Sequence, residues 1–394
     1  MPTNLQKIFL IVGTRPEFIK LAPLYLKMKE LKLKPFWIQT NQHKELLEDL
    51  KEFWEIYPDF EFNLENKNLS LAKLSSELIL EGTKIFEQEK PDLVIVQGDT
   101  LSAAEAAKAA FFLKAKLNIK IAHVEAGLRT KNILSPFPEE FNRRTISELA
   151  DYHFCPSKKS FENLCKEKNI CTSKANEANI YLTGNTGIDA LLLAKKRIES
   201  TDLHSKNYIL ITSHRKENLE NNMQKNLCEA IYKILKNEEI EINFLVSLHS
   251  NPSAQKNFHD LESKLKNENI AGLKTINACS YPEFIKLLEN TLFIITDSGG
   301  VQEEAPYLNK FALILREELE REEVYENGYA EKLENDCESI LKSILKTYKK
   351  ISKEEIKITN IDKNFYGTGS SSELITREVI LTQFTHLKKM TATR

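Results

Sequence analysis

Three carboxylates in the first half of the sequence occupy positions where a general acid or base is expected. Asp99 lies in a Gln-Gly-Asp-Thr motif, Glu125 in His-Val-Glu-Ala-Gly-Leu-Arg and Glu139 in Pro-Phe-Pro-Glu-Glu. Each follows an apolar run that predicts a β-strand, or begins a stretch that predicts a helix. Helix capping would also account for Asp99 and Glu139, but a glycine turn and Arg129 directly follow Glu125. Capping does not predict that all three meet at one cleft, so they are candidate acid-base groups.

Two glycine-containing turns predict anion-binding sites. In the first, Gly13 to Lys20, the cations Arg15 and Lys20 lie beside a predicted helix N-terminus. In the second, Asp297 to Ala305, small residues follow an apolar strand and open a helix, so that backbone N–H groups can bind a phosphate. Glu304 lies deeper in that helix, where its carboxylate can accept two hydrogen bonds from a ribose diol. A diphosphate beside a ribose indicates a nucleotide, although a plain βα turn and a tight helix start would leave the same residues in place.

His214 and Arg215 directly follow the apolar run 208–212, where they supply a titratable donor and a fixed cation. A lone histidine is usually structural, but its place beside an arginine at a strand end favours a functional role. The sequence has no GxGxxG or GxxxxGK[ST] motif, which argues against a dinucleotide dehydrogenase and a P-loop NTPase. It has no HExxH or CxxC pairing either, so we expect no metal and no cofactor.

The elements that must position these residues alternate between short β-rich runs and longer amphipathic stretches. This pattern predicts the α/β class, with two Rossmann-like, doubly wound domains that face a cleft. The predicted strands are 8–12, 35–39, 93–97, 119–124, 152–155, 208–212, 244–248, 273–276, 292–296 and 312–315. The predicted helices are 17–30, 43–54, 71–87, 102–116, 139–150, 158–167, 223–235, 254–266, 281–289, 302–308, 337–348 and 373–387. A short strand and turn at 181–187 predict a hinge, and the last helix could cap either domain.

The composition is that of an ordinary globular protein. The chain has 394 residues, of which 41% are hydrophobic and 28% are charged, and 55 basic against 57 acidic residues give a net charge of -2. This balance argues against disorder and against a nucleic-acid partner. The apolar run 8–12 is too short for a signal peptide or a membrane span, so we expect a cytoplasmic protein that does not bind a membrane. The six scattered cysteines predict reduced thiols.

Taken in order, these motifs resemble the non-hydrolysing UDP-N-acetylglucosamine 2-epimerases, with a collinear match from Ile8 to about Ser372. The motifs that carry the resemblance are 13–20, 97–100, 123–130, 138–140, 183–186, 214–215 and 297–300. The resemblance implies a glycosyltransferase-B-type architecture, a homodimer, and interconversion of UDP-GlcNAc and UDP-ManNAc without metal or nicotinamide. It also implies an acid-base domain at 1–185, a UDP-binding domain at 186–365, and a C-terminal helix, 366–394, that packs back on the first domain.

The chemistry implied is elimination of UDP to a 2-acetamidoglucal, followed by re-addition with the C2 proton delivered to the opposite face. By resemblance, Asp99, Glu125 and Glu139 are the acid-base group, and His214 assists the departing diphosphate. The positions that resemble the UDP-sugar site are Arg15, Lys20, Arg215, Phe284, Ser298, Gly299, Gly300, Glu304 and Arg321. The positions that resemble a second, activating UDP-GlcNAc site are Gln42, His43, Glu140 and His249.

One loop departs from the family pattern. The family usually reads Arg-Asp-Thr-Thr-Glu-Arg-Pro-Glu, whereas residues 316–323 here read Arg-Glu-Glu-Leu-Glu-Arg-Glu-Glu. Loss of the threonine pair and the proline leaves open a modified UDP-hexosamine as substrate. The sequence is also compatible with a UDP-sugar glycosyltransferase of the same fold and with a nucleotide-sugar-binding regulator. As an epimerase the protein would supply ManNAc units for a bacterial surface polysaccharide.

Overall fold

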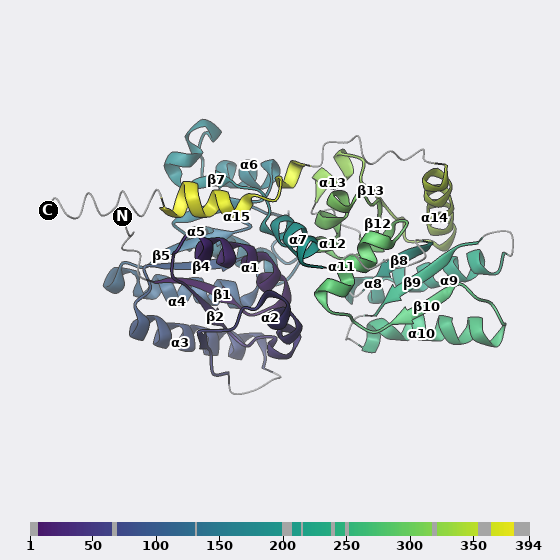
Figure 1. The fold of residues 1–394 in the computed structure, drawn as a ribbon, viewed down its shortest axis with the longest axis horizontal. Coiled ribbons are helices and arrows are strands. Elements are labelled where there is room, and N and C mark those ends of the chain that lie inside the picture. Colours follow the sequence, from purple (N-terminus) through teal and green to yellow (C-terminus); the bar gives the residue numbers. More distant parts are fainter. Residues whose placement is uncertain are drawn as a thin grey trace. The chain divides into compact units, whose positions relative to one another are not determined.

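The chain forms two compact α/β units in the computed structural model (Figure 1). The structure describes residues 7–64, 69–130, 132–198, 207–213, 216–237, 241–248, 252–316, 321–353 and 364–381. The first unit comprises residues up to 193 together with those from 364 onward, and the second comprises residues 194–363. Each unit is built on a parallel sheet, which confirms the predicted pair of Rossmann-like α/β domains.

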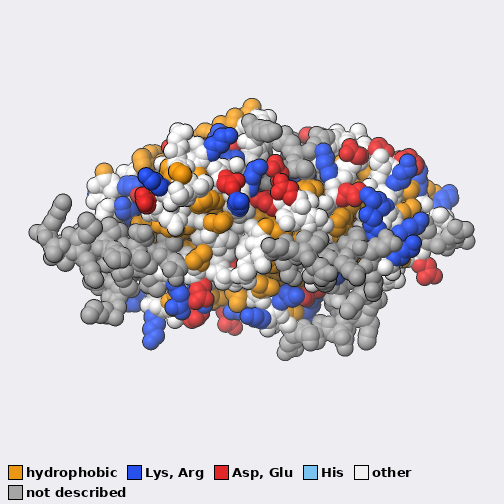
Figure 2. Space-filling view, turned by 90° about the horizontal axis from the view of Figure 1, so that it is seen from above, with side chains coloured by type: hydrophobic (Ala, Val, Ile, Leu, Met, Phe, Trp, Pro, Cys, Tyr) orange, Lys and Arg blue, Asp and Glu red, His pale blue; other side chains and the backbone are white. Residues whose placement is uncertain are grey.

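Acidic and basic side chains lie next to one another over much of the coloured surface in Figure 2. This mixing agrees with the near-neutral net charge of -2. Within the described part of the chain, no helix is long and apolar enough to cross a membrane.

The sheet of the first unit has seven parallel strands in the order β3-β2-β1-β4-β5-β6-β7 within the described residues. The strands are β1 (Ile8–Val12), β2 (Pro35–Gln39), β3 (Phe60–Glu61), β4 (Leu93–Gln97), β5 (Lys120–Val124), β6 (Tyr152–Cys155) and β7 (Ile180–Leu182). The main helices are α1 (Arg15–Glu30), α2 (Glu48–Trp54), α3 (Leu71–Glu89), α4 (Leu101–Leu117), α5 (Glu139–Leu149), α6 (Lys158–Glu167) and α7 (Thr186–Arg197). Short 3-10 turns are η1 (Lys44–Leu47), η2 (Thr172–Ala178) and η5 (Asn364–Tyr366).

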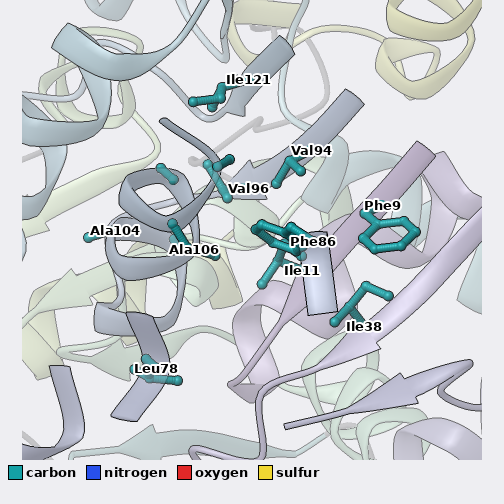
Figure 3. Packing of buried hydrophobic residues seen from close by; sticks show 14 of the residues in the cluster. Phe9, Ile11, Ile38, Leu78, Phe86, Val94, Val96, Ala104, Ala106 and Ile121 are labelled. Carbon is teal, nitrogen blue, oxygen red and sulfur yellow. The ribbon is translucent and has the colours of Figure 1, made fainter. Parts of the chain in front are cut away.

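The core of the first unit forms because successive strand residues point to opposite faces of the sheet. One face carries Phe9, Ile38 and Val96, which pack against Phe86 of α3 and Ala106 of α4 (Figure 3). The helix that starts beyond β1, α1, covers the opposite face, where Phe18 packs edge-on against Trp37 with ring centroids 4.7 Å apart. Burying both faces explains why the strands appear in the sequence as nearly continuous apolar runs.

The second unit has six parallel strands in the order β10-β9-β8-β11-β12-β13 within its described residues. They are β8 (Tyr208–Thr212), β9 (Asn243–Ser247), β10 (Leu273–Ile276), β11 (Ile294–Thr296), β12 (Ala312–Ile314) and β13 (Ala330–Lys332). The helices are α8 (Lys216–Glu220), α9 (Met223–Leu235), α10 (Pro252–Asn267), α11 (Tyr281–Asn290), α12 (Gly299–Glu304), η3 (Ala305–Leu308), α13 (Glu322–Glu326) and α14 (Cys337–Ser352).

The structure differs from the sequence prediction mainly where elements are short. The segment expected to be a hinge leads into α7, because Asn185 accepts the Gly187 N–H at 2.8 Å and the apolar side chains of the helix are buried. The strands β3 and β13 and the helices α8 and α13 have five residues or fewer, too few to show a hydrophobic period. The predicted last helix, 373–387, begins as α15 (Ser371–Leu374) and continues as the π-helical turn η6 (Ile375–Leu381). Its residues from 382 onward lie outside the described part of the chain.

The C-terminal segment belongs to the first unit because it is bonded to the chain around residue 185. Asn185 N donates to Tyr366 O at 2.8 Å. The backbone N–H groups of Ser371 and Ser372, at the start of α15, donate to the buried Asp189 carboxylate at 3.1 and 2.6 Å. One aspartate therefore caps a helix that lies more than 180 residues away in the sequence.

Candidate active site

The three candidate acid-base carboxylates come to the carboxyl edge of the first unit's sheet. Strands β4 and β5 are parallel neighbours, with Gln97 opposite Val124, and Gly98 N donates to Val124 O at 3.0 Å. The turns that carry Asp99 and Glu125 therefore leave the sheet side by side. Glu139, the third carboxylate, is the first residue of α5, a helix that packs against β5 and α4. Ligands of parallel α/β sheets bind at this edge.

Glu125 is held by two donors, one from helix α1 and one from the end of strand β4. Its Oε2 accepts from Lys20 Nζ and from Gln97 Nε2, each at 2.5 Å. Its backbone has φ +69°, a left-handed conformation that a residue with a Cβ adopts only at a cost. The fold thus turns this carboxylate away from the strand direction and fixes it beside an ammonium group, which stabilises negative charge on it.

This contact gives Lys20 a partner that the sequence did not predict. The resemblance implies a place for Lys20 at the diphosphate, and the structure pairs it with Glu125 through side chains that are only 12% and 10% exposed. Arg15, expected at the same diphosphate, donates to Asp49 Oδ1 at 2.6 Å and to Leu46 O at 3.2 Å. The assignment of both cations to the diphosphate stays a prediction.

Asp99 is bonded to two consecutive residues of α5. Arg143 Nε donates to Asp99 Oδ2 at 2.8 Å, and Asn142 Nδ2 donates to the backbone oxygen of Asp99 at 2.9 Å. Neither residue is singled out by the sequence motifs. The feature of the sequence that could have identified them is their position. They lie three and four residues after Glu139, on the first turns of a helix that begins with this candidate catalytic group.

Glu139 and Glu140 differ in their exposure. Glu139 is partly exposed, whereas Glu140 is fully buried. Glu140 accepts from Thr130 N at 3.0 Å, from Arg144 Nε at 2.9 Å and from Arg143 Nη1 at 3.3 Å. This environment favours an internal supporting role for Glu140 over the direct contact with a second ligand that the resemblance implies.

The turn between β1 and α1 contains a buried carboxylate that the sequence motifs left unassigned. Glu17 Oε2 accepts from Gly13 N, Thr14 N and Thr14 Oγ1, and its Oε1 accepts from Thr100 Oγ1. Complete burial raises the pKa of Glu17 to about 7, although these donors favour the ionised form. The signal in the sequence is the capping box, Thr14 followed three residues later by Glu17.

Gly13 is required by packing inside the protein. A Cβ there would collide with Thr40 Oγ1 and Ser102 Oγ, which are hydrogen-bonded to each other at 2.6 Å. Ser102 Oγ also donates to Gln42 Oε1 at 2.7 Å. Gln42, expected at a second ligand site, is therefore tied to the first turn of α4, while the neighbouring His43 side chain is exposed.

The second unit places its candidate anion site at the start of α12. A Cβ on Gly299 would lie 3.1 Å from the Arg321 guanidinium, so the glycine lets this cation approach the backbone. A Cβ on Gly300 would meet no atom of the described residues within 4 Å. Arg321 is oriented by Glu303, whose Oε1 accepts from its Nε at 3.0 Å and pairs with its Nη2 at 2.9 Å. The start of α12 thus combines the Arg321 cation with the open backbone at Gly300.

Of the other predicted residues of the second unit, the structure describes Ser298, Glu304 and Phe284. Ser298 precedes α12, Glu304 is its last residue and is partly exposed, and Phe284 is partly buried on α11. Asp297 is buried and accepts from Asn218 Nδ2 at 2.8 Å and from Ser213 Oγ at 3.2 Å. His214, Arg215 and His249 lie outside the described residues.

Over the described ranges, the structure contains no group of three or more histidine, cysteine, aspartate or glutamate side chains that could hold a metal ion. The six cysteines are present as free thiols.

Known proteins match nearly the whole chain. A family model described as UDP-N-acetylglucosamine 2-epimerase matches residues 27–380. A UDP-N-acetylglucosamine 2-epimerase of Campylobacter jejuni is 37% identical over 389 residues, which cover 94% of this chain and 96% of the relative. One of Neisseria meningitidis is 35% identical and covers 95% of this chain and 99% of the relative.

Solved structures agree with these sequence matches. The crystal structure of UDP-GlcNAc 2-epimerase from Neisseria meningitidis bound to UDP-GlcNAc has a TM-score of 0.83 at 34% identity, covering 95% of this chain and 99% of that one. The enzyme from Methanocaldococcus jannaschii in complex with UDP-GlcNAc and UDP has a TM-score of 0.78 at 31% identity, covering 96% and 99%. Such neighbours have the glycosyltransferase-B-like fold.

Proposed function

The chain belongs to the UDP-N-acetylglucosamine 2-epimerase family, and from this premise we propose that it interconverts UDP-GlcNAc and UDP-ManNAc. The observation that carries the proposal is the set of carboxylates at one sheet edge, with Asp99 bonded to Arg143 and Glu125 bonded to Lys20. An epimerase that works at an unactivated carbon needs both a proton acceptor and a proton donor at that carbon.

The proposed reaction breaks two bonds of the substrate and then remakes them. A carboxylate takes the C2 proton while the C1–O bond breaks, so UDP leaves with the electron pair and a C1–C2 double bond forms. UDP then adds back at C1, and a proton is delivered to the other face of C2. We assign Asp99, Glu125 and Glu139 to these proton transfers and His214 to assistance of the leaving diphosphate.

Binding of UDP is assigned mainly to the second unit. The open backbone at Gly300, with Ser298 and Gly299, supports a role in holding the diphosphate, and Arg321 lies against the same turn. We also place Arg215, Arg15 and Lys20 at the diphosphate, Glu304 at the ribose and Phe284 near the uracil. In this proposal Lys20 pairs with Glu125 in the free enzyme and with the diphosphate when the substrate is bound.

Regulation by a second UDP-GlcNAc is part of the proposal. Gln42 and His43 are its main candidates in the first unit, together with His249. His43 is exposed, which fits contact with a ligand. Glu140 would contribute through the Thr130 backbone that it holds, because its own carboxylate is buried.

We further propose a homodimer formed through exposed apolar side chains of the first unit. Leu80 of α3, Phe112 of α4 and Phe141 of α5 are 68%, 64% and 47% exposed. The three helices are consecutive neighbours, and Lys108, one turn before Phe112, lies over the Phe141 ring. Exposed apolar side chains that gather on adjacent elements mark interaction sites.

In the cell, we propose that the enzyme acts in the cytoplasm and supplies ManNAc units for a bacterial surface polysaccharide. The free thiols fit a reducing compartment. The altered loop 316–323, part of which lies outside the described residues, makes modified UDP-hexosamines the main alternative substrates.

The proposal is tested by proton NMR of UDP-GlcNAc incubated with the purified protein in D2O, without metal or acceptor. We expect UDP-ManNAc to appear with deuterium at C2. The variants Asp99→Asn, Glu125→Gln and Glu139→Gln should each lower turnover by roughly 100-fold or more, because each removes one proton-transfer group. Binding of UDP, measured by calorimetry, should persist in all three.

Glu148→Gln serves as the matched control, because Glu148 is an exposed carboxylate on α5 and should tolerate the change. Wild-type rates in all three active-site variants would contradict the mechanism. UDP binding without exchange at C2 would redirect the assignment to a modified hexosamine, and consumption of the nucleotide sugar only with an acceptor would indicate a glycosyltransferase.

A further inference from the structure

Asp99 is held on one side by Arg143 and Asn142, two neighbouring residues of α5. The 2.8 Å contact from Arg143 Nε reaches the carboxylate itself, and the 2.9 Å contact from Asn142 reaches its backbone oxygen. We propose that Arg143 is a positioning residue that fixes the orientation of the Asp99 carboxylate, and that Glu140 fixes Arg143 in turn. This inference rests on the proposed function, since it assigns a support to one of its acid-base groups.

The Arg143 side chain is suited to this role because it is buried and constrained. It is 6% exposed, whereas Asp99 is 26% exposed and stands at the edge of the sheet. A planar guanidinium that is held at several of its nitrogens has little freedom to turn. Its Nη1 lies 3.3 Å from Glu140 Oε2, and the Glu140 side chain has no exposed surface.

Glu140 connects this support to the segment that follows Glu125. Its Oε2 also accepts from Thr130 N at 3.0 Å, and Thr130 Oγ1 donates to Ser135 O at 2.7 Å. The same carboxylate therefore holds the loop that leads to Glu139. Through these contacts, Arg143 and Glu140 fix the position of Asp99 relative to the segment that contains Glu139.

The neighbouring Arg144 provides a comparison within the same helix. Arg144 Nε donates to the other oxygen of Glu140 at 2.9 Å, and its Nη2 donates to Thr130 O at 3.4 Å, but its side chain is 42% exposed. Both arginines thus pair with Glu140. Among the described residues, Arg143 is the one of the two that is bonded to a candidate catalytic carboxylate.

The test compares Arg143→Gln with Arg144→Gln in steady-state epimerisation assays and in thermal unfolding. Arg143→Gln should lower kcat on the order of 100-fold, because a small misplacement of a reacting group has a cost of this size. Its KM and its affinity for UDP should stay close to the wild-type values. Arg144→Gln should keep kcat, although it also removes an ion pair with Glu140.

Two further variants separate positioning from general structural support. Arg143→Lys keeps the charge and should recover part of kcat. In the Asp99→Asn background, Arg143→Gln should cause no further loss, because the group on which it acts has been removed.

The inference would be overturned if Arg143→Gln and Arg144→Gln lowered kcat equally, if Arg143→Gln kept kcat, or if its loss added fully to that of Asp99→Asn. None of these three results would contradict the proposed function, provided that the wild-type enzyme epimerises UDP-GlcNAc. A wild type that exchanges no hydrogen at C2 would contradict the proposed function and this inference together.

Discussion

Two histidines lie inside the first unit, beneath the candidate acid-base groups. His123 of β5 and His153 of β6 are paired across adjacent strands, and His123 Nε2 is 2.7 Å from Gly98 O, next to Asp99. Burial lowers the pKa of His123 to about 4 and the pKa of His153 to about 3. Both side chains are therefore neutral at pH 7.

From this burial we predict that acid destabilises the fold through these histidines. The unfolded chain binds protons near pH 6.5 while the folded chain does not, so the free energy of unfolding falls as the pH drops from about 6.5 toward 4. His153→Gln should reduce this fall by about 2.5 kcal/mol at pH 4.5. Urea unfolding at a series of pH values measures the effect.

The exposed His259 of α10 gives a control. His259→Gln should leave the pH dependence of unfolding as in the wild type. If the free energy of unfolding of His153→Gln fell with pH as steeply as that of the wild type, the buried histidine would not titrate as its environment indicates.

Helix starts in this protein are stabilised by acceptors that lie both near and far in the sequence. Thr14 and Glu17, at the N-cap and in the first turn, cap α1, whereas α15 is capped by Asp189 of α7. The near caps are visible as sequence motifs. The distant cap is not, because it exists only once the C-terminal segment has reached the first unit.

We predict that Asp189→Ala loosens the C-terminal segment while the sheet of the first unit stays folded. Loss of a helix cap costs about 1 kcal/mol, so the amides of residues 371–376 should exchange roughly 5-fold faster. Hydrogen exchange with mass spectrometry measures the change. Asp336→Ala, which removes the comparable cap of α14 at Ser339 N, should speed exchange in α14 and leave 371–376 unchanged. Wild-type exchange at 371–376 in Asp189→Ala would refute the capping role.

For the whole molecule, the proposed homodimer predicts a mass of twice 45.4 kDa in sedimentation velocity. Phe112→Glu should shift the protein toward the monomer, because it places a charge among apolar side chains at the interface. Leu182 of β7 is 48% exposed and provides a matched control, so Leu182→Glu should keep the wild-type mass. A wild type that sediments as a monomer at micromolar concentration would contradict the dimer.

Much of the fold was predictable from the sequence because its longer elements have local signals. The strands 8–12, 93–97 and 208–212 agree with the structure residue for residue, since strands buried on both faces are continuous apolar runs. The helix predicted at 71–87 ends two residues later in the structure. The three-residue strand β13 was missed because it is too short for such a signal, and α7 was missed because the segment 181–187 was interpreted as a hinge.

The sequence by itself placed Asp99, Glu125 and Glu139 at the carboxyl edge of the first sheet, because each follows a strand or starts a helix that local patterns reveal. Only the tertiary structure decided their partners. Lys20 and Glu125 lie 105 residues apart, and Arg143 and Asp99 lie 44 apart. Their pairing depends on which strands are neighbours and on where α5 packs, and no local pattern encodes these contacts. The same reason explains why the burial of Glu140 and the packing around Gly13 became visible only in the folded chain.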